Sequence, residues 1–165
     1  GAAGITEPIL IGHSDGASIA IIAAGEGHIA PRALVLIAPH VFVEDLSVAS
    51  IAAAREAYEH GDLRARLAKY HADVDGAFWG WNGAWLDPAF RAWNLEAYLP
   101  RITAPALIVQ GTADQYGTLA QVTAIERQLA GPVETMLVAG AGHAPFRDQP
   151  ALVHARIAGI GRQVD

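Results

Sequence analysis

The chain of 165 residues is long enough for one globular core, and its 52% hydrophobic and 17% charged residues exclude a disordered chain. Its 17 acidic residues outnumber its 11 basic ones, and the net charge of −6 argues against binding to nucleic acid or to an anionic membrane. The absence of cysteine excludes disulfides, thiolate metal sites and a cysteine nucleophile.

Continuous apolar runs indicate four β-strands separated by helical segments. The strands are expected near residues 9–11, 33–37, 106–110 and 133–138. Helices are expected near residues 16–25, 119–129 and 151–160, with a longer, mostly helical stretch within 47–98. Buried parallel strands have such continuous apolar sequences. We therefore predict an α/β fold with a small parallel sheet of about four strands flanked by helices. It forms one domain over residues 1–165, with a helical, cap-like insertion at 47–98 between the second and third strands.

Each end of the chain carries a further signal. Asp148, just before Gln149 and Pro150, is a suitable N-cap for the last helix. The first residues lack the charged and then apolar pattern of a signal peptide, and no run is long enough to span a bilayer. We therefore expect a cytoplasmic protein that has no membrane partner.

The first predicted strand runs into the motif Gly12-His13-Ser14-Asp15-Gly16, and an apolar helical pattern follows directly. A strand, a sharp turn and a helix form the context that a G-x-S-x-G nucleophile elbow requires. The two glycines allow a strained turn, and the serine between them is lifted into a cleft. Ser14 is therefore the candidate nucleophile, and the alternative is that it only caps the helix.

Two later strands each end in a loop with a residue that could assist Ser14. Asp114 lies in the small-residue loop 111–116 after the third strand, and His143 lies in the glycine-rich loop 140–145 after the fourth. The order Ser, Asp, His along the chain is that of α/β-hydrolases and differs from the other two well-known serine hydrolase orders. From about Pro8 to its end, the chain resembles the α/β-hydrolase superfamily, in its esterase and lipase-like branch.

The resemblance implies a catalytic triad. A serine hydroxyl is a weak nucleophile, so His143 would take its proton during attack on a carbonyl and return it to the leaving group. Asp114 would hold the other ring nitrogen and stabilise the imidazolium. The backbone N–H of Asp15 would donate to the oxyanion, while its side chain places a negative charge that disfavours anionic substrates. Asp45, after the second strand, is a competing acid, and Asp114 could instead cap the next helix.

A complete member of the superfamily carries further strands, and the loop with a second oxyanion donor, before its elbow. Only a short segment precedes the first predicted strand here, so the resemblance is to the C-terminal portion of the fold, in a minimal or truncated hydrolase. A neighbouring subunit, a later loop or a water molecule would then replace that donor. Because an uncovered sheet edge favours association, we expect a homo-oligomer.

Aromatic residues gather in the helical stretch, which holds all 4 tryptophans. Insertions at this point of the superfamily commonly form a cap, so the resemblance suggests that these rings shape a substrate pocket. The alternative is that they anchor the helices onto the sheet. The candidate substrate-binding residues, from the stretch and from the surroundings of the triad, are His40, Trp79, Trp81, Trp85, Tyr116 and Phe146.

The other histidines lack the spacing of a metal site such as H-E-x-x-H. Because the triad supplies its own nucleophile and base, neither a metal nor a cofactor is expected. His13, next to the nucleophile, is expected to pack beneath the elbow rather than to transfer protons.

These observations predict a serine hydrolase that cleaves small, neutral, fairly apolar carboxylic esters through an acyl-enzyme, with low activity if the oxyanion hole is incomplete. Hydrolysis of amides, thioesters or C–C bonds, and perhydrolysis, stay open because a fold does not decide its substrate. The alternative function is that of a non-catalytic remnant serving as a ligand-binding or self-assembly module, which the missing early strands would suggest. The presence of all three triad residues argues against it.

Overall fold

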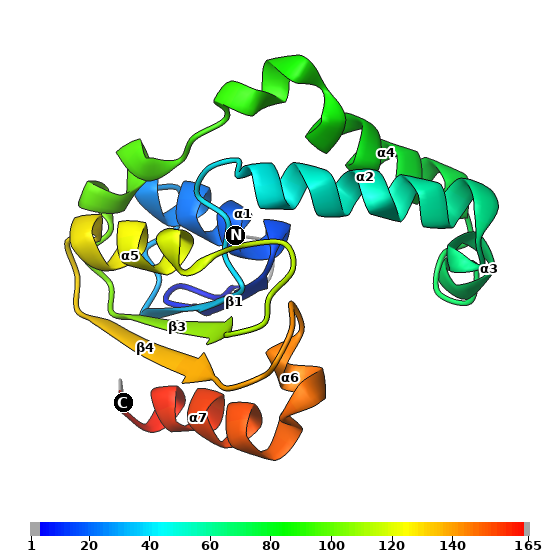
Figure 1. The fold of residues 1–165 in the computed structure, drawn as a ribbon. Helices are drawn as coiled ribbons and strands as arrows, with labels where there is room; N and C mark the ends of the chain where they lie inside the picture. The colour runs from blue at the N-terminus through cyan, green and yellow to red at the C-terminus, as the bar shows by residue number, and fades with distance from the viewer. Residues whose placement is uncertain (1–3, 164–165) are drawn as a thin grey trace. The chain divides into compact units, whose positions relative to one another are not determined.

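The structure is a computed structural model that describes residues 4–163, and it divides into two compact units (Figure 1). The first unit comprises the chain up to Phe42 and from Asn94 onward, and the second comprises Val43–Trp93. All of the described strands lie in the first unit, and the second is helical. The helical unit covers most of the predicted insertion, while residues 94–98 belong to the first unit.

Four parallel strands form the sheet of the first unit, in the order β1-β2-β3-β4. Every residue of β2 and β3 is buried, as expected for strands at the centre of a sheet that is covered on both faces. The predicted small parallel sheet with a helical insertion between its second and third strands is therefore confirmed. The strands are β1 (Ile9–His13), β2 (Ala33–Ile37), β3 (Ala106–Gly111) and β4 (Val133–Val138).

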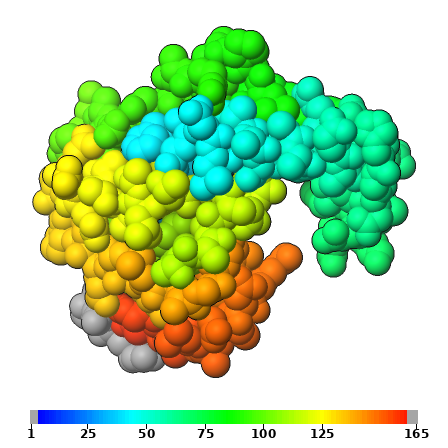
Figure 2. Space-filling model, viewed as in Figure 1, coloured from blue at the N-terminus to red at the C-terminus, as the bar shows by residue number. Residues whose placement is uncertain are grey.

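Helices cover both faces of this sheet (Figure 1). On one face lie α1 (Asp15–Gly25) and α5 (Leu119–Gln128), with the 3₁₀ helix η2 (Glu96–Arg101) beside them. On the other face lie α6 (Pro145–Asp148) and α7 (Pro150–Gln163). Alternate residues of β2 and β3, among them Val35 and Val109, point to this face. Val153 of α7 packs with them in one cluster and is fully buried. The space-filling view shows the chain around α6, in orange, at the surface of the first unit (Figure 2).

The prediction that Asp148 caps the last helix is wrong. Asp148 is the last residue of α6, and Gln149 separates it from the first residue of α7. Its carboxylate instead accepts a hydrogen bond of 2.8 Å from the backbone N–H of Gly142. A short extra turn of helix after Ala144 moves the start of α7 by one residue and leaves the carboxylate free to hold the preceding loop.

The second unit packs its helices through aromatic rings. Its elements are α2 (Asp45–His60), α3 (Leu63–Leu67), α4 (Val74–Leu86) and the 3₁₀ helix η1 (Pro88–Ala92). Tyr58 of α2 stacks on Phe78 of α4 with ring centroids 3.7 Å apart. Trp85 lies 5.1 Å from Phe90 and 5.8 Å from Trp93, centroid to centroid. The core of this unit is therefore largely aromatic.

β1 forms one edge of the sheet and pairs, among the described strands, with β2 alone. Ile11 on this strand is 58% exposed and Ile19 on α1 is 67% exposed. The expected self-association concerns this apolar edge and stays a prediction. Within the part of the chain that the structure describes, each helix is too short or too polar to cross a bilayer.

Candidate active site

The turn after β1 has the strained geometry of an elbow. Ser14 has φ 55° and ψ −123°, in the positive-φ part of the backbone map that residues with a Cβ rarely adopt. A side chain at Gly12 would overlap the backbone of Gly16 and Ala17, so the strand can pass this close to the helix only with glycine there. The Ser14 side chain makes no capping hydrogen bond to α1. Its hydroxyl is therefore available for hydrogen bonds with residues of the loops that follow β3 and β4.

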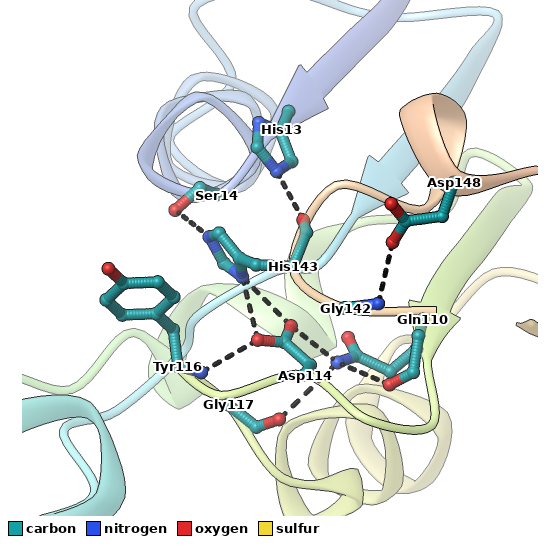
Figure 3. A network of polar contacts seen from close by, with 10 residues as sticks. His13, Ser14, Gln110, Asp114, Tyr116, Gly117, Gly142, His143 and Asp148 are labelled. Atoms are coloured by element: carbon teal, nitrogen blue, oxygen red, sulfur yellow. Dashed lines mark hydrogen bonds and ion pairs between the residues drawn. The ribbon is translucent and has the colours of Figure 1, made fainter. Parts of the chain in front are cut away.

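The structure brings the three predicted triad residues together (Figure 3). The Nε2 atom of His143 lies 2.9 Å from the hydroxyl of Ser14. The Nδ1 atom lies 2.9 Å from one carboxylate oxygen of Asp114 and 3.0 Å from the other. A carboxylate accepts hydrogen bonds and cannot donate them, so Nδ1 carries the proton and Nε2 accepts from the serine hydroxyl. This is the tautomer in which a histidine can act as a base toward serine.

Asp114 is held from three sides and its side chain is only 1% exposed. Besides His143, it accepts hydrogen bonds of 2.8 Å from the side-chain amide of Gln110 and of 2.8 Å from the backbone N–H of Tyr116. Burial acts to raise the pKa of this carboxyl, but the hydrogen bonds from His143, Tyr116 and Gln110 outweigh it and hold the pKa below its ordinary value. The site therefore keeps a carboxylate, as an orienting acid requires.

The two loops that carry Asp114 and His143 are joined by their backbones. The N–H of Ala113 donates to the carbonyl of Ala141 over 2.9 Å, and the N–H of Gly140 donates to the hydroxyl of Thr112 over 2.8 Å. A Cβ at Gly111 would overlap the carbonyl oxygens of residues 141 and 142. This close approach explains why small residues fill both loops and how they place His143 over Asp114.

The structure separates the predicted triad residues from their alternatives. Asp45, the competing acid, lies in the helical unit, where it forms an ion pair of 2.7 Å with Arg91. The helix that Asp114 was alternatively expected to cap is capped by Thr118, whose hydroxyl accepts from the N–H of Ala120. Asp15 is the first residue of α1. Its backbone N–H thus belongs to a helix N-terminus, which favours negative charge.

Two of the predicted substrate-binding residues lie beside the triad. The rings of Tyr116 and His40 have their centroids 4.9 Å and 5.6 Å from that of His143. Burial raises the pKa of Tyr116, and the charge of Asp114 raises it further, so the phenol stays neutral. His40 is buried, and its carbonyl accepts a hydrogen bond from the hydroxyl of Ser18. Both residues lie against the ring of His143 within the first unit.

Phe146 and the tryptophans have mainly packing contacts. Phe146 packs edge-on against His13, with centroids 5.1 Å apart, and against the core beneath α7. In the second unit, Trp81 packs on the cluster around Phe78, and Trp79 contacts Tyr58 and Phe78 edge-on. Within this unit the rings hold helix against helix.

Sequence reasoning missed two residues that hold the site. Gln110 ends the otherwise apolar run of β3, and a polar residue there, directly before the loop of Asp114, was a usable signal. The sequence around Asp148 is typical of a helix cap and does not indicate that its carboxylate accepts a hydrogen bond from Gly142. A third residue, His13, does more than pack, because its Nε2 atom lies 2.7 Å from the backbone carbonyl of His143.

Among the described residues, the one group of side chains close enough to share a metal ion is Glu56, Glu59 and His60. All three are exposed on α2, and such exposed acidic groups are common without a metal. They give no ground for a metal centre.

Comparisons with known proteins agree with this architecture. The sequence model described as "Alpha/beta hydrolase family" matches residues 1–156. Among solved structures, lip1 from Acinetobacter baumannii AYE has a TM-score of 0.74 at 19% identity, and the alignment covers 99% of this chain and 63% of the lip1 chain. The search of curated proteins returned no match.

Two further structures are similar at low sequence identity. CarC, a serine hydrolase involved in carbazole degradation, has a TM-score of 0.69 at 14% identity, covering 93% of this chain and 62% of its own. The proline iminopeptidase of Mycobacterium smegmatis has a TM-score of 0.68 at 16% identity, covering 99% of this chain and 67% of its own. The chain thus spans about two thirds or less of their lengths, and the likeness shows the fold.

Proposed function

This chain belongs to the alpha/beta hydrolase family, and we propose that it is a serine hydrolase that cleaves small, neutral carboxylic esters through an acyl-enzyme. The observation that carries the proposal is the pair of contacts at His143, 2.9 Å from Ser14 on one ring nitrogen and 2.9 Å from Asp114 on the other. A nucleophile, a base within hydrogen-bond reach of it and an orienting acid are the parts that acyl transfer needs.

The proposed reaction has two halves. The Ser14 oxygen attacks the carbonyl carbon of the ester while its proton passes to Nε2 of His143, which gives a tetrahedral oxyanion. The bond to the alcohol oxygen then breaks, and the alcohol leaves with the proton from Nε2. Water attacks the acyl-serine, Nε2 takes a proton from the water, and Ser14 recovers that proton as the acid departs.

Charge developing during the reaction has partners in the first unit. The backbone N–H of Asp15, at the start of α1, is the donor proposed for the oxyanion. Asp114 faces the imidazolium that forms when His143 holds the proton. Asp15 directly follows Ser14 in the chain, and the pKa of Asp114 is held low enough to keep its carboxylate, so both add negative charge to this region, which supports the preference for an uncharged acyl group.

The test is hydrolysis of p-nitrophenyl acetate and p-nitrophenyl butyrate by the wild type, by Ser14→Ala and by Ser50→Ala, a matched substitution in α2. We expect Ser14→Ala to lower kcat/KM by about 10³-fold or more, and Ser50→Ala to retain wild-type activity. The p-nitrophenyl ester of succinate, which is as long as the butyrate but carries a carboxylate, should react more slowly. Equal rates for wild type and Ser14→Ala would contradict the proposal and favour the ligand-binding or self-assembly module instead.

A further inference from the structure

His13 combines two properties that packing alone does not require. It is the last residue of β1 and directly precedes Ser14, and its Nε2 atom lies 2.7 Å from the backbone carbonyl oxygen of His143. A carbonyl oxygen can only accept a hydrogen bond, so Nε2 of His13 carries a hydrogen and donates it. This contact joins the elbow to the loop of the base across 130 residues of sequence (Figure 3).

The ring of His13 is held in place by its neighbours. Its centroid lies 5.0 Å from that of His143 and 5.1 Å from that of Phe146, which meets it edge-on. The charged and titratable groups that act on it are His143, Asp114 and Arg147. A ring fixed on two sides presents its Nε2–H in one direction, so the donor is pre-organised for the carbonyl.

The loop that receives this hydrogen bond needs external support. It contains Gly140, with φ +71°, and Gly142, so its backbone has more conformational freedom than a loop of larger residues. Asp148 holds the N–H of Gly142, before His143, and His13 holds the carbonyl of His143 itself. The first tie holds the peptide group between residues 141 and 142, and the second holds the peptide group between His143 and Ala144, so the two restrict the backbone that carries the ring of His143.

We propose that His13 is a positioning residue for the base. Of the two neighbouring residues, His13 holds the main chain of His143 and Ser14 contacts the ring of His143. The proposal rests on the proposed hydrolase function. A displacement of about 1 Å in a catalytic group can cost about 10²-fold in rate, and the hydrogen bond from His13 prevents such a displacement of His143 from the oxygen of Ser14.

The charge state of His13 fits this position. Burial lowers the pKa of His13, and the nearby His143 also acts to lower it, although the hydrogen bond to the carbonyl and the charge of Asp114 oppose them. His13 is therefore neutral at neutral pH. When acid protonates it, a cation faces the ring of His143 and disfavours the imidazolium that the reaction needs. We expect the acid side of the pH profile to contain this second protonation.

The test compares two amides that differ by one methylene group. In His13→Gln the amide nitrogen reaches about as far as Nε2 of the histidine, whereas in His13→Asn it reaches only as far as Nδ1. We expect His13→Gln to retain kcat within about threefold and His13→Asn to lose about 10- to 100-fold in kcat with little change in KM. His13→Gln should also lose one protonation from the acid side of its pH profile. Equal kcat values for the two variants would overturn the positioning role.

A third variant distinguishes loss of the hydrogen-bond donor from loss of the aromatic ring, and a spectroscopic measurement locates the proton on His13. His13→Phe retains an aromatic ring against Phe146 without the donor, so it should be as slow as His13→Asn, and wild-type activity in it would overturn the proposal. ¹⁵N-resolved NMR of the wild type should show His13 with its proton on Nε2, and a proton on Nδ1 alone would overturn the contact. If Ser14→Ala loses activity while all His13 variants keep it, the proposed function stands and this proposal fails. If Ser14→Ala retains activity, the hydrolase function fails and the positioning role fails with it.

Discussion

The surroundings of the triad in the first unit and the surface of the second unit use polar side chains in different ways. Around the triad, polar contacts are buried or half-buried and join residues far apart in sequence, such as His143 and Ser14, which are 129 positions apart. In the second unit, ion pairs are exposed, as between Arg64 and Asp75, whose side chains are 54% and 52% exposed. The buried contacts of the second unit are mostly between aromatic rings.

Because of this difference, the residues that orient His143 are distinct from those that pack the second unit. A hydrogen bond between buried charged groups is strong and fixes direction, because little water competes for the partners. Exposed ion pairs contribute little to stability. The first unit therefore has the means to hold a base in one orientation, while the second unit obtains its stability from ring packing. Substitutions in the two units should affect different measurable properties.

The largest expected effect is on the acid of the triad. Asp114→Asn removes the charge that faces the imidazolium and lets His143 adopt the wrong tautomer, so kcat should fall by about 10³- to 10⁴-fold. Asp45→Asn is the matched control in the second unit and should leave kcat unchanged. Steady-state kinetics on p-nitrophenyl acetate decide between the two acids. A loss in Asp45→Asn with none in Asp114→Asn would reverse the assignment.

The next effect is on the stability of the second unit. Trp85 is 5% exposed and packs against Phe90 and Trp93, so Trp85→Ala should destabilise this unit by about 3–5 kcal/mol. Urea unfolding followed by tryptophan fluorescence measures this change. The rate at which a small fluorophosphonate labels Ser14 should stay near that of the wild type. A parallel loss of labelling would show that the chemistry depends on both units.

A smaller effect is expected at the support of Asp114. Gln110→Leu keeps the volume of the buried side chain but removes the donor to the carboxylate, which should cost about 1–3 kcal/mol of stability. The pKa of Asp114 is lowered in the folded state, so its contribution to stability is present above the unfolded pKa and is lost as pH falls through the folded one. Losing the donor raises the folded pKa, so acid unfolding should begin at a higher pH than in the wild type. An unchanged acid transition would contradict the role of Gln110.

Much of the first unit could be predicted from local sequence. β2 and β4 occur at the predicted residues, because continuous apolar runs bounded by loop residues leave few other choices. The proximity of Ser14, Asp114 and His143 also follows from topology, since the carboxyl ends of parallel strands meet at one edge of a sheet.

The remaining features depend on contacts between distant segments. The hydrogen bond of His13 goes to a backbone carbonyl, which any residue would offer, so no pattern of side chains indicates it. The sequence indicates a helix cap at Asp148 because the intervening turn of α6 has no clear sequence signal. The core of the second unit is a further such feature, because the aromatic residues of the insertion suit a pocket as well as a separate core.

The activation of Ser14 is tested most directly by treating the folded wild-type protein and the His143→Ala variant with a fluorophosphonate. Mass spectrometry then locates the adduct in each protein. We predict a single adduct, on the oxygen of Ser14, that forms in the wild type and is lost in His143→Ala. An adduct on another serine, no adduct on folded protein, or equal labelling in His143→Ala would contradict the claim that His143 and Asp114 activate Ser14.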